Sequence, residues 1–252
     1  MAGPLSAHNY LQLLRRWRKV ARHGALDLGI FAQAGGYPVI ALRSRRPPEN
    51  APSAYLSAGI HGDEPAGPLA ALEMLRSGAF DDGRPWAICP ALNPTGLLAG
   101  TRDSASGADL NRDYLRRQSP EVAAHAAWLE SRPAPGLFIS LHEDWESSGF
   151  YFYEINLGPD DPDRAANILH AVQTWFPAEP SAVIDDHEVR SPGWIHHAAR
   201  ADFPEHWPEA IFIAHLGCPL SFTLETPSSA ALPDRIAAHH AAVLAILDHR
   251  NP

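Results

Sequence analysis

The stretch "SAGIHGDEPAG" (57–67) places a histidine and two acids around a glycine, directly after an apolar run. Pro65, a residue that helices tolerate in their first turn, follows the second acid. The order predicts a strand that ends, turns sharply and enters a helix, with His61 and Glu64 at the corner. An imidazole and a carboxylate at this spacing can bind a metal ion, but they can also form a polar turn. The H-x-x-E spacing recurs in "EHWPEA" (205–210), so it does not by itself separate the two interpretations.

Two other predicted strands end in residues of the same kind. The strands predicted at 54–60, 137–142 and 219–225 lead to His61, His142 and Glu225, respectively. In open α/β sheets, ligands collect at the carboxyl ends of strands, so these groups and Glu64 could converge. Two neutral imidazoles and one carboxylate suit Zn²⁺. Glu225 would then lie outside the metal shell, where a carboxylate can take a proton from water and pass it to a leaving amine. Each residue alone is compatible with a structural role, and only the ordered combination favours a metal site.

The segment "NPTGLLAGTRDSASGADLNRDY" (93–114) contains groups that can bind a carboxylate or an oxyanion. The planar fork of an arginine such as Arg112 binds a carboxylate through two parallel hydrogen bonds, and Asn111 can donate another. A second arginine, Arg102, could stabilise charge that develops on a carbonyl oxygen. The alternative interpretation is a solvated loop with surface ion pairs.

Short apolar runs alternate with helical patterns along the rest of the chain. Strands are predicted at 37–44, 54–60, 85–92, 137–142, 149–155 and 219–225, and helices at about 8–22, 65–78, 120–131, 162–175 and 233–248. The segment 210–216 fits either state, and Asp161 or Asp163 is a candidate cap for the fourth helix. This alternation predicts an α/β sheet covered by helices on both faces. The unassigned stretches 93–119 and 185–210 are interpreted as functional loops.

Composition limits the classes of function. The 252 residues are 45% hydrophobic, which predicts one catalytic domain over 1–252. A net charge of −9 argues against a nucleic-acid partner, and the locally basic stretch 13–24 is interpreted as an exposed helix face rather than a membrane-binding one. Cys89 and Cys218 lie in apolar runs and are expected to be buried reduced thiols. No secretory signal or membrane span is visible, so a cytoplasmic location is expected.

Taken together, these motifs resemble those of the M14-type zinc carboxypeptidases. The matching stretches, in chain order, are "HGDE" (61–64), "NPTG…R" (93–102), "GADLNR" (107–112), "SLH" (140–142) and "FTLE" (222–225). The resemblance implies a mixed, largely parallel eight-stranded sheet sandwiched between helices. It also implies one Zn²⁺ per chain, held by His61, Glu64 and His142.

The same resemblance assigns roles to the remaining candidates. Arg102 corresponds to the arginine that polarises the scissile carbonyl and stabilises the oxyanion. Asn111 and Arg112 correspond to the pair that holds the terminal carboxylate of the substrate, and Glu225 to the general base and acid. The implied substrate is a peptide, or a peptide-like molecule, with a free carboxylate.

The chain departs from pancreatic-type members at the residue that closes over the substrate. Those members carry a tyrosine before the catalytic glutamate, and this chain has no tyrosine after Tyr153. The candidate replacements are Trp194, His196, His197 and Trp207. The acids Asp144, Glu146, Glu205 and Glu209 are interpreted as surface residues, with selection of a basic substrate side chain as the alternative.

Four activities are compatible with these motifs. A carboxypeptidase ranks first, because the chain resembles compact bacterial members that have no propeptide. A cytoplasmic murein peptide amidase, which cleaves a γ-D-glutamyl–diaminopimelate bond, ranks second. An N-acyl amino acid deacylase of the succinylglutamate desuccinylase/aspartoacylase branch ranks third, since that branch typically shows "HGNE" and usually lacks "NPTG". A zinc-containing peptide-binding protein is the non-enzyme alternative, and the presence of Glu225 and Arg102 argues against it.

Overall fold

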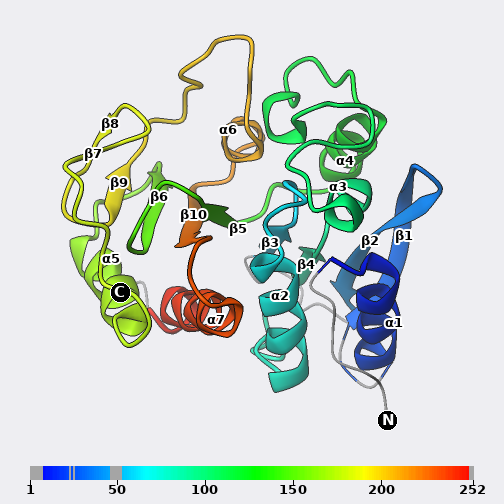
Figure 1. Ribbon diagram of the computed structural model, residues 1–252, viewed down its shortest axis with the longest axis horizontal. Helices are drawn as coiled ribbons and strands as arrows, with labels where there is room; N and C mark the ends of the chain where they lie inside the picture. Colours follow the sequence, from blue (N-terminus) through cyan, green and yellow to red (C-terminus); the bar gives the residue numbers. More distant parts are fainter. Residues whose placement is uncertain (1–7, 23, 25, 46–52, 250–252) are drawn as a thin grey trace.

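The computed structural model describes residues 8–22, 24, 26–45 and 53–249 (Figure 1). Within this part of the chain, an eight-stranded sheet has the order β1-β2-β4-β3-β5-β10-β6-β9. Its strands are β1 (Leu26–Ala34), β2 (Tyr37–Ser44), β3 (Ala54–Ala58), β4 (Trp86–Cys89), β5 (Leu137–Asp144), β6 (Tyr151–Asn156), β9 (Trp194–His196) and β10 (Leu220–Pro227). A separate hairpin is formed by β7 (Val183–Ile184) and β8 (His187–Glu188).

The sheet is mixed, as expected. Four of its pairings are parallel and three are antiparallel. The neighbours β4, β3, β5 and β10 are all parallel, so their carboxyl ends lie at one edge. The predicted α/β architecture is therefore confirmed.

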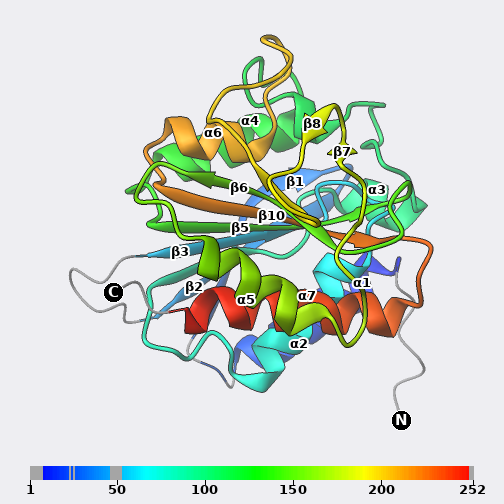
Figure 2. The same ribbon diagram turned by 90° about the vertical axis from the view of Figure 1, so that its left-hand side faces the viewer.

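Helices cover both faces of the sheet (Figure 2). One face is covered by α1 (Tyr10–Ala21), α2 (Ala66–Ser77), α5 (Pro162–Val172) and α7 (Leu232–Asp248). The other face carries α4 (Pro120–Glu130) and α6 (Glu209–His215). The short helix α3 (Pro94–Ala99) and the 3₁₀ turn η1 (Leu110–Arg112) lie between β4 and α4 in the chain. Among the described helices, none is long and apolar enough to cross a bilayer.

Burial on both faces explains why the central strands are mostly apolar. On β3, Tyr55 packs in the cluster beneath α4 and α6, while its neighbour Leu56 packs in the cluster beneath α1, α2 and α7. The ring of Tyr55 stacks on Phe138 of β5, with centroids 5.2 Å apart. Successive strand residues point to opposite faces, so a strand covered on both sides is apolar at most of its positions. Cys89 and Cys218 are buried free thiols, as predicted.

Local sequence signals account for most of the element boundaries. The side chains of Asn9, Asn93 and Asp161 cap α1, α3 and α5, which settles the choice between Asp161 and Asp163. The strand predicted at 37–44 is confirmed as β2, and the other predicted strands are present with ends that shift by a few residues. The ambiguous segment 210–216 is helical, as part of α6.

The predictions missed β1 and α3, as well as the turn η1 and the strands β7, β8 and β9. The edge strand β1 is only partly buried, so its apolar residues do not alternate regularly. It pairs with β2 across a turn at Gly35 and Gly36, which both have positive φ. The helix α3 lies inside the unassigned stretch 93–119, where Asn93 caps it and Pro94 occupies its first turn.

Candidate active site

Three parallel strands deliver the predicted groups to one edge of the sheet. The strand β3 leads into His61, β5 carries His142 and β10 carries Glu225. In the β5–β10 ladder, His142 and Glu225 are direct partners. The convergence predicted from the three strand ends is therefore present in the structure.

The corner after β3 depends on glycine. Gly59 has φ +61°, a conformation that side-chain-bearing residues rarely adopt. A Cβ atom on Gly62 would lie 1.9 Å from the carbonyl carbon of Gly96 and 2.2 Å from the nitrogen of Leu97. The backbone of the "HGDE" turn is thus packed directly on the backbone of α3, and only glycine fits at this position.

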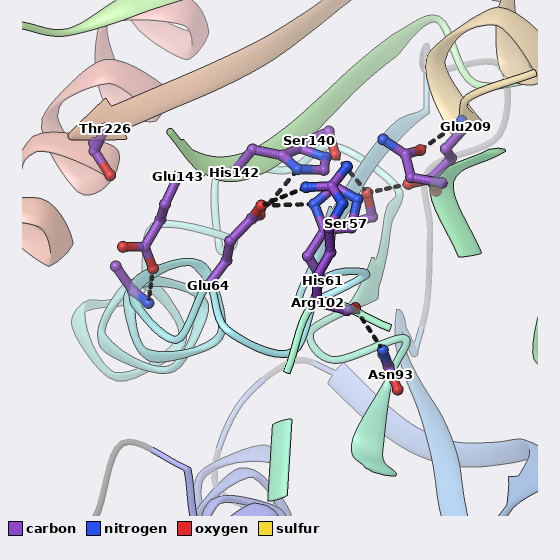
Figure 3. Close-up of polar contacts among 12 residues, drawn as sticks. Ser57, His61, Glu64, Asn93, Arg102, Ser140, His142, Glu143, Glu209 and Thr226 are labelled. Carbon is purple, nitrogen blue, oxygen red and sulfur yellow. Dashed lines mark hydrogen bonds and ion pairs between the residues drawn. The ribbon is translucent and has the colours of Figure 1, made fainter. Parts of the chain in front are cut away.

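His61, Glu64 and His142 form a buried cluster (Figure 3). Nδ1 of His61 lies 2.6 Å from one carboxylate oxygen of Glu64, and Nδ1 of His142 lies 3.0 Å from the other. One potential ligand atom from each residue lies within 4.8 Å of the other two. The three side chains are exposed by only 4–7%. Both imidazoles thus turn the same ring nitrogen toward one carboxylate.

The donor set and its electrostatics fit a divalent cation. Burial disfavours the ionised carboxylate of Glu64, but the neighbouring His61 and His142 outweigh this effect and hold its pKa well below the usual value. Burial also opposes a charge on His61, yet Glu64 and Asp109 raise the pKa of this imidazole to about 9. Oε2 of Glu64 and Nε2 of His61 are buried and make no hydrogen bond of good geometry within the described residues, although Nδ1 of His142 lies 3.0 Å from the former and Asp109 lies 3.4 Å from the latter. Positive charge stabilises a buried carboxylate, and two imidazoles with one carboxylate form a set that can bind zinc.

Asp109 joins this cluster to the predicted arginine, although sequence reasoning did not single it out. One of its oxygens accepts a hydrogen bond from Nε of Arg102 at 3.0 Å, and the other lies 3.4 Å from Nε2 of His61. The latter oxygen also accepts a hydrogen bond from the backbone N–H of Asn111. Through this bond Asp109 caps η1. Burial opposes ionisation, but His61, Arg102 and Arg112 together hold the pKa of Asp109 well below its usual value. Such outer partners fix the orientation of metal-binding histidines.

Arg102 is held at the mouth of the cluster. Its Nη1 lies 3.9 Å from a carboxylate oxygen of Glu64. Its backbone carbonyl accepts hydrogen bonds from Nδ2 of Asn93 at 3.2 Å and from the N–H of Gly62 at 3.4 Å (Figure 3). The side chain of Arg102 remains 43% exposed beside these buried groups. It is therefore both fixed and accessible to a substrate.

Asn111 and Arg112 are connected to the cluster through Asp109. The side-chain carbonyl of Asn111 accepts a hydrogen bond from the backbone N–H of Glu209 at 2.9 Å. This contact orients the amide and does not use its N–H groups. Arg112 is exposed, and its charge helps to hold the pKa of Asp109 low. The pair thus presents donors on the loop that also carries the partner of His61.

Glu225 is half-buried beside the cluster. Burial raises the pKa of this carboxyl well above its usual value, and the negative charges of Glu64, Asp144 and Asp185 raise it further. A carboxyl group whose pKa is shifted upward in this way can take up a proton and release it again.

Glu143 locks the helix that follows the "HGDE" corner. One of its oxygens accepts a hydrogen bond from the backbone N–H of Ala66 at 2.6 Å, and the other pairs with Arg235. Burial raises the pKa of Glu143 to about 7. Because Glu143 is adjacent to His142 and Ala66 opens α2, this contact couples β5 to the helix that begins after Glu64.

The interpretation of Glu209 as a surface residue is wrong. It is 1% exposed, and its carboxylate accepts hydrogen bonds from Tyr55 at 2.9 Å and Ser57 at 2.7 Å. Burial raises its pKa to about 7, although the two hydroxyls partly oppose this shift. In its buried position Glu209 supports the site from beneath through the contact of its backbone with Asn111.

One of the four candidate capping side chains is excluded. Trp194 is 4% exposed and packs within the larger core cluster. Trp207 stacks on His215, with ring centroids 4.4 Å apart, and His197 contacts His187. His196 is exposed on the edge strand β9.

Comparison with known proteins agrees with this geometry. Residues 50–174 match the succinylglutamate desuccinylase/aspartoacylase catalytic domain family. A solved structure from Shewanella amazonensis, provisionally classed as a metallopeptidase, superposes with a TM-score of 0.85 at 24% identity, covering 96% of this chain and 93% of that one. A metallo-carboxypeptidase from Burkholderia cenocepacia superposes with a TM-score of 0.70 at 20% identity, covering 97% of this chain and 69% of that one. The resemblance to the M14-type family is confirmed.

A curated relative is also named as a carboxypeptidase. The Trichophyton verrucosum protein named "Probable carboxypeptidase 2" is 27% identical over 145 residues, which is 52% of this chain. The match spans only 24% of that protein's length. The chain therefore has a carboxypeptidase-like α/β fold, in which the buried His–Glu–His cluster is a candidate metal site.

Proposed function

We propose that this chain is a zinc-dependent metallocarboxypeptidase that hydrolyses the amide bond next to a free C-terminal carboxylate. The observation that carries the proposal is the position of Asp109, which contacts both Arg102 and His61 and caps the turn that holds Asn111. This arrangement supports one zinc-binding cluster, one oxyanion-stabilising group and one carboxylate receptor on a single loop and sheet edge.

Each group has a distinct part in the proposed reaction. His61, Glu64 and His142 would hold the zinc ion, which when bound supplies a Lewis acid and lowers the pKa of a water nucleophile. Glu225 accepts the proton of the attacking water and returns it to the leaving amine. Arg102 stabilises the negative charge that develops on the carbonyl oxygen.

Asn111 and Arg112 position the substrate. Their donors fit a carboxylate, which is the group that an exopeptidase must recognise beside the scissile bond. The buried free cysteines Cys89 and Cys218 are compatible with a cytoplasmic location, which we include in the proposal.

A second candidate is an N-acyl amino acid deacylase, favoured by the family match over residues 50–174. That activity also cleaves an amide next to a carboxylate, so it uses the same groups. The two activities differ in the acyl side of the substrate, which is a peptide in one case and a small acid in the other.

Side-by-side turnover of four substrate types tests the proposal. They are a free-acid peptide, the same peptide as its C-terminal amide, an N-succinyl or N-acetyl amino acid, and a γ-D-glutamyl–diaminopimelate muropeptide. The free-acid peptide should be cleaved, and the amide should react far more slowly, because a neutral amide offers no negative charge to the guanidinium of Arg112. Equal cleavage of acid and amide would contradict a carboxypeptidase. Turnover of the acyl amino acid alone would favour the deacylase, and turnover of the muropeptide alone would favour a murein amidase.

A further inference from the structure

A second group of potential metal ligands lies outside the cluster of His61, Glu64 and His142. It is formed by His187 on β8, His197 directly after β9, and Asp202 in the segment that leads to α6. Nε2 of His187 lies 3.4 Å from Oδ2 of Asp202, and Nε2 of His197 lies 3.3 Å from the same oxygen. We propose that these three residues form a second zinc site, whose existence does not depend on the proposed activity.

The hydrogen bonding of His197 supports a cation between these atoms. Its Nδ1 lies 2.5 Å from the backbone carbonyl of Ala198, so Nδ1 carries a proton there. Nε2 of the same ring lies 3.3 Å from Oδ2 of Asp202, so this nitrogen and the carboxylate face one point that a metal ion can share. A carbonyl on the far nitrogen is the usual support of a metal-bound histidine.

The donor chemistry selects the class of metal. Two imidazole nitrogens and one carboxylate oxygen suit zinc, with water completing the shell, whereas calcium and magnesium prefer oxygen ligands throughout. The side chains of His187, His197 and Asp202 are exposed by 23%, 12% and 54%. Water therefore reaches this site, and its ion is held less tightly than one in the buried cluster.

The proposed site would fasten the segment that carries Asp185, whose charge acts on Glu225. The ring of Tyr153 packs against His187 and His197, at centroid distances of 5.6 and 6.0 Å, and its hydroxyl donates to Asp185. Asp185 is one of the charges that raise the pKa of Glu225.

The other end of this segment reaches the loop that carries Asn111 and Arg112. The backbone N–H of Tyr114 donates to the carbonyl of Trp207 at 3.2 Å, and Trp207 forms a β-bridge with Asp113. A metal at His187, His197 and Asp202 would thus anchor the chain between β8 and the loop that carries Asn111. Figure 1 shows the segment between β9 and α6 rising beside the loop that precedes α4.

Zinc stoichiometry in the full chain tests the inference. The protein is stripped with a chelator, titrated with Zn²⁺ against a competing indicator, and its metal content is measured after dialysis. The wild type should bind two equivalents. His187→Ala combined with His197→Ala should weaken the second equivalent by about 100-fold or more and leave the first intact. Asp202→Asn should also weaken binding of the second equivalent. His170→Ala, which removes an exposed histidine elsewhere, should leave the binding of both equivalents unchanged.

A variant of the first site separates this inference from the proposed function. His61→Ala combined with His142→Ala should still bind one equivalent, and adding the His187 and His197 changes should abolish it. A single wild-type equivalent that survives the His187/His197 changes, or two equivalents that both survive them, would overturn the inference. Full occupancy in the His61/His142 variant, with both equivalents retained, would instead overturn the first zinc site.

Discussion

His142 and Glu225 are register partners on the adjacent parallel strands β5 and β10. Paired residues on neighbouring strands project from the same face of a sheet, so the backbone ladder fixes their separation. The charge of Glu64 reaches Glu225 and contributes to its raised pKa. The group proposed to move the proton and a group proposed to bind the metal are thus held by one hydrogen-bonded frame.

Arg102 and Arg112 should differ in their kinetics. Arg112→Ala should mainly raise KM, because its exposed guanidinium would hold the substrate carboxylate equally in the ground and transition states. Arg102→Ala should mainly lower kcat, because this group would meet charge that grows in the transition state. Steady-state kinetics on a free-acid peptide give both constants. Since Arg102 also contacts Asp109, zinc content must be measured in each variant, and identical kinetic profiles would contradict this division of roles.

Gly62→Ala should strongly destabilise the protein. The added Cβ would meet the backbone of Gly96 and Leu97 at 1.9 and 2.2 Å, so α3 or the "HGDE" turn must move. We expect a loss of about 3 kcal/mol or more in the free energy of unfolding, which corresponds to about 6–12 °C in Tm for a chain of this size. Thermal unfolding followed by circular dichroism measures it.

Gly29→Ala is the matched control for Gly62→Ala. A Cβ on Gly29 has no neighbour closer than 4.0 Å, and its backbone is extended. This variant should unfold within a few degrees of the wild type. Equal Tm values for the Gly62 and Gly29 variants would refute the close packing of the corner on α3.

Glu209 should make stability depend on pH. Its pKa is about 7 in the folded protein against 4.5 for an unperturbed side chain, so the folded state binds more protons than the unfolded state between these values. Stability due to this group is therefore full below about pH 4.5 and is lost as the pH rises toward 7, by up to about 3 kcal/mol. The adjacent His125 has a pKa lowered to about 3 by burial and stays neutral throughout this range.

Glu209→Gln isolates this effect, because glutamine does not titrate and all other groups are shared with the wild type. Denaturant unfolding at several pH values between 4.5 and 7 gives the two stability curves. The free energy of unfolding of Glu209→Gln should increase relative to that of the wild type as the pH rises. Parallel curves would show that Glu209 does not titrate in this range.

Much of the sheet could be predicted because its strands are buried on both faces. The strand β2 was predicted with its observed bounds, and β3, β5 and β10 with their order and their polar ends. These signals are local: an apolar run stops, and a histidine or glutamate follows. The edge strand β1 has no such signal, since it is exposed along much of its length.

The supporting residues could not be predicted, because their roles depend on partners far away in the chain. Glu209 follows a proline at the start of a short helix, which is typical of an exposed acid. Its burial results from the hydroxyls of Tyr55 and Ser57, which lie more than 150 residues earlier. Asp109 had a local signal, because an aspartate two residues before Asn111 can cap a turn, but its contact with His61 is a tertiary feature.

The most direct test of the account is zinc content and turnover measured together in Glu225→Gln. Glutamine keeps the shape of the side chain and removes the carboxylate that would accept the proton. Zinc content should stay at the wild-type level while kcat falls by roughly 10²–10⁴-fold. Glu130→Gln, which changes an exposed acid on α4, should leave both quantities unchanged. Near-normal turnover of Glu225→Gln with zinc retained would contradict the account.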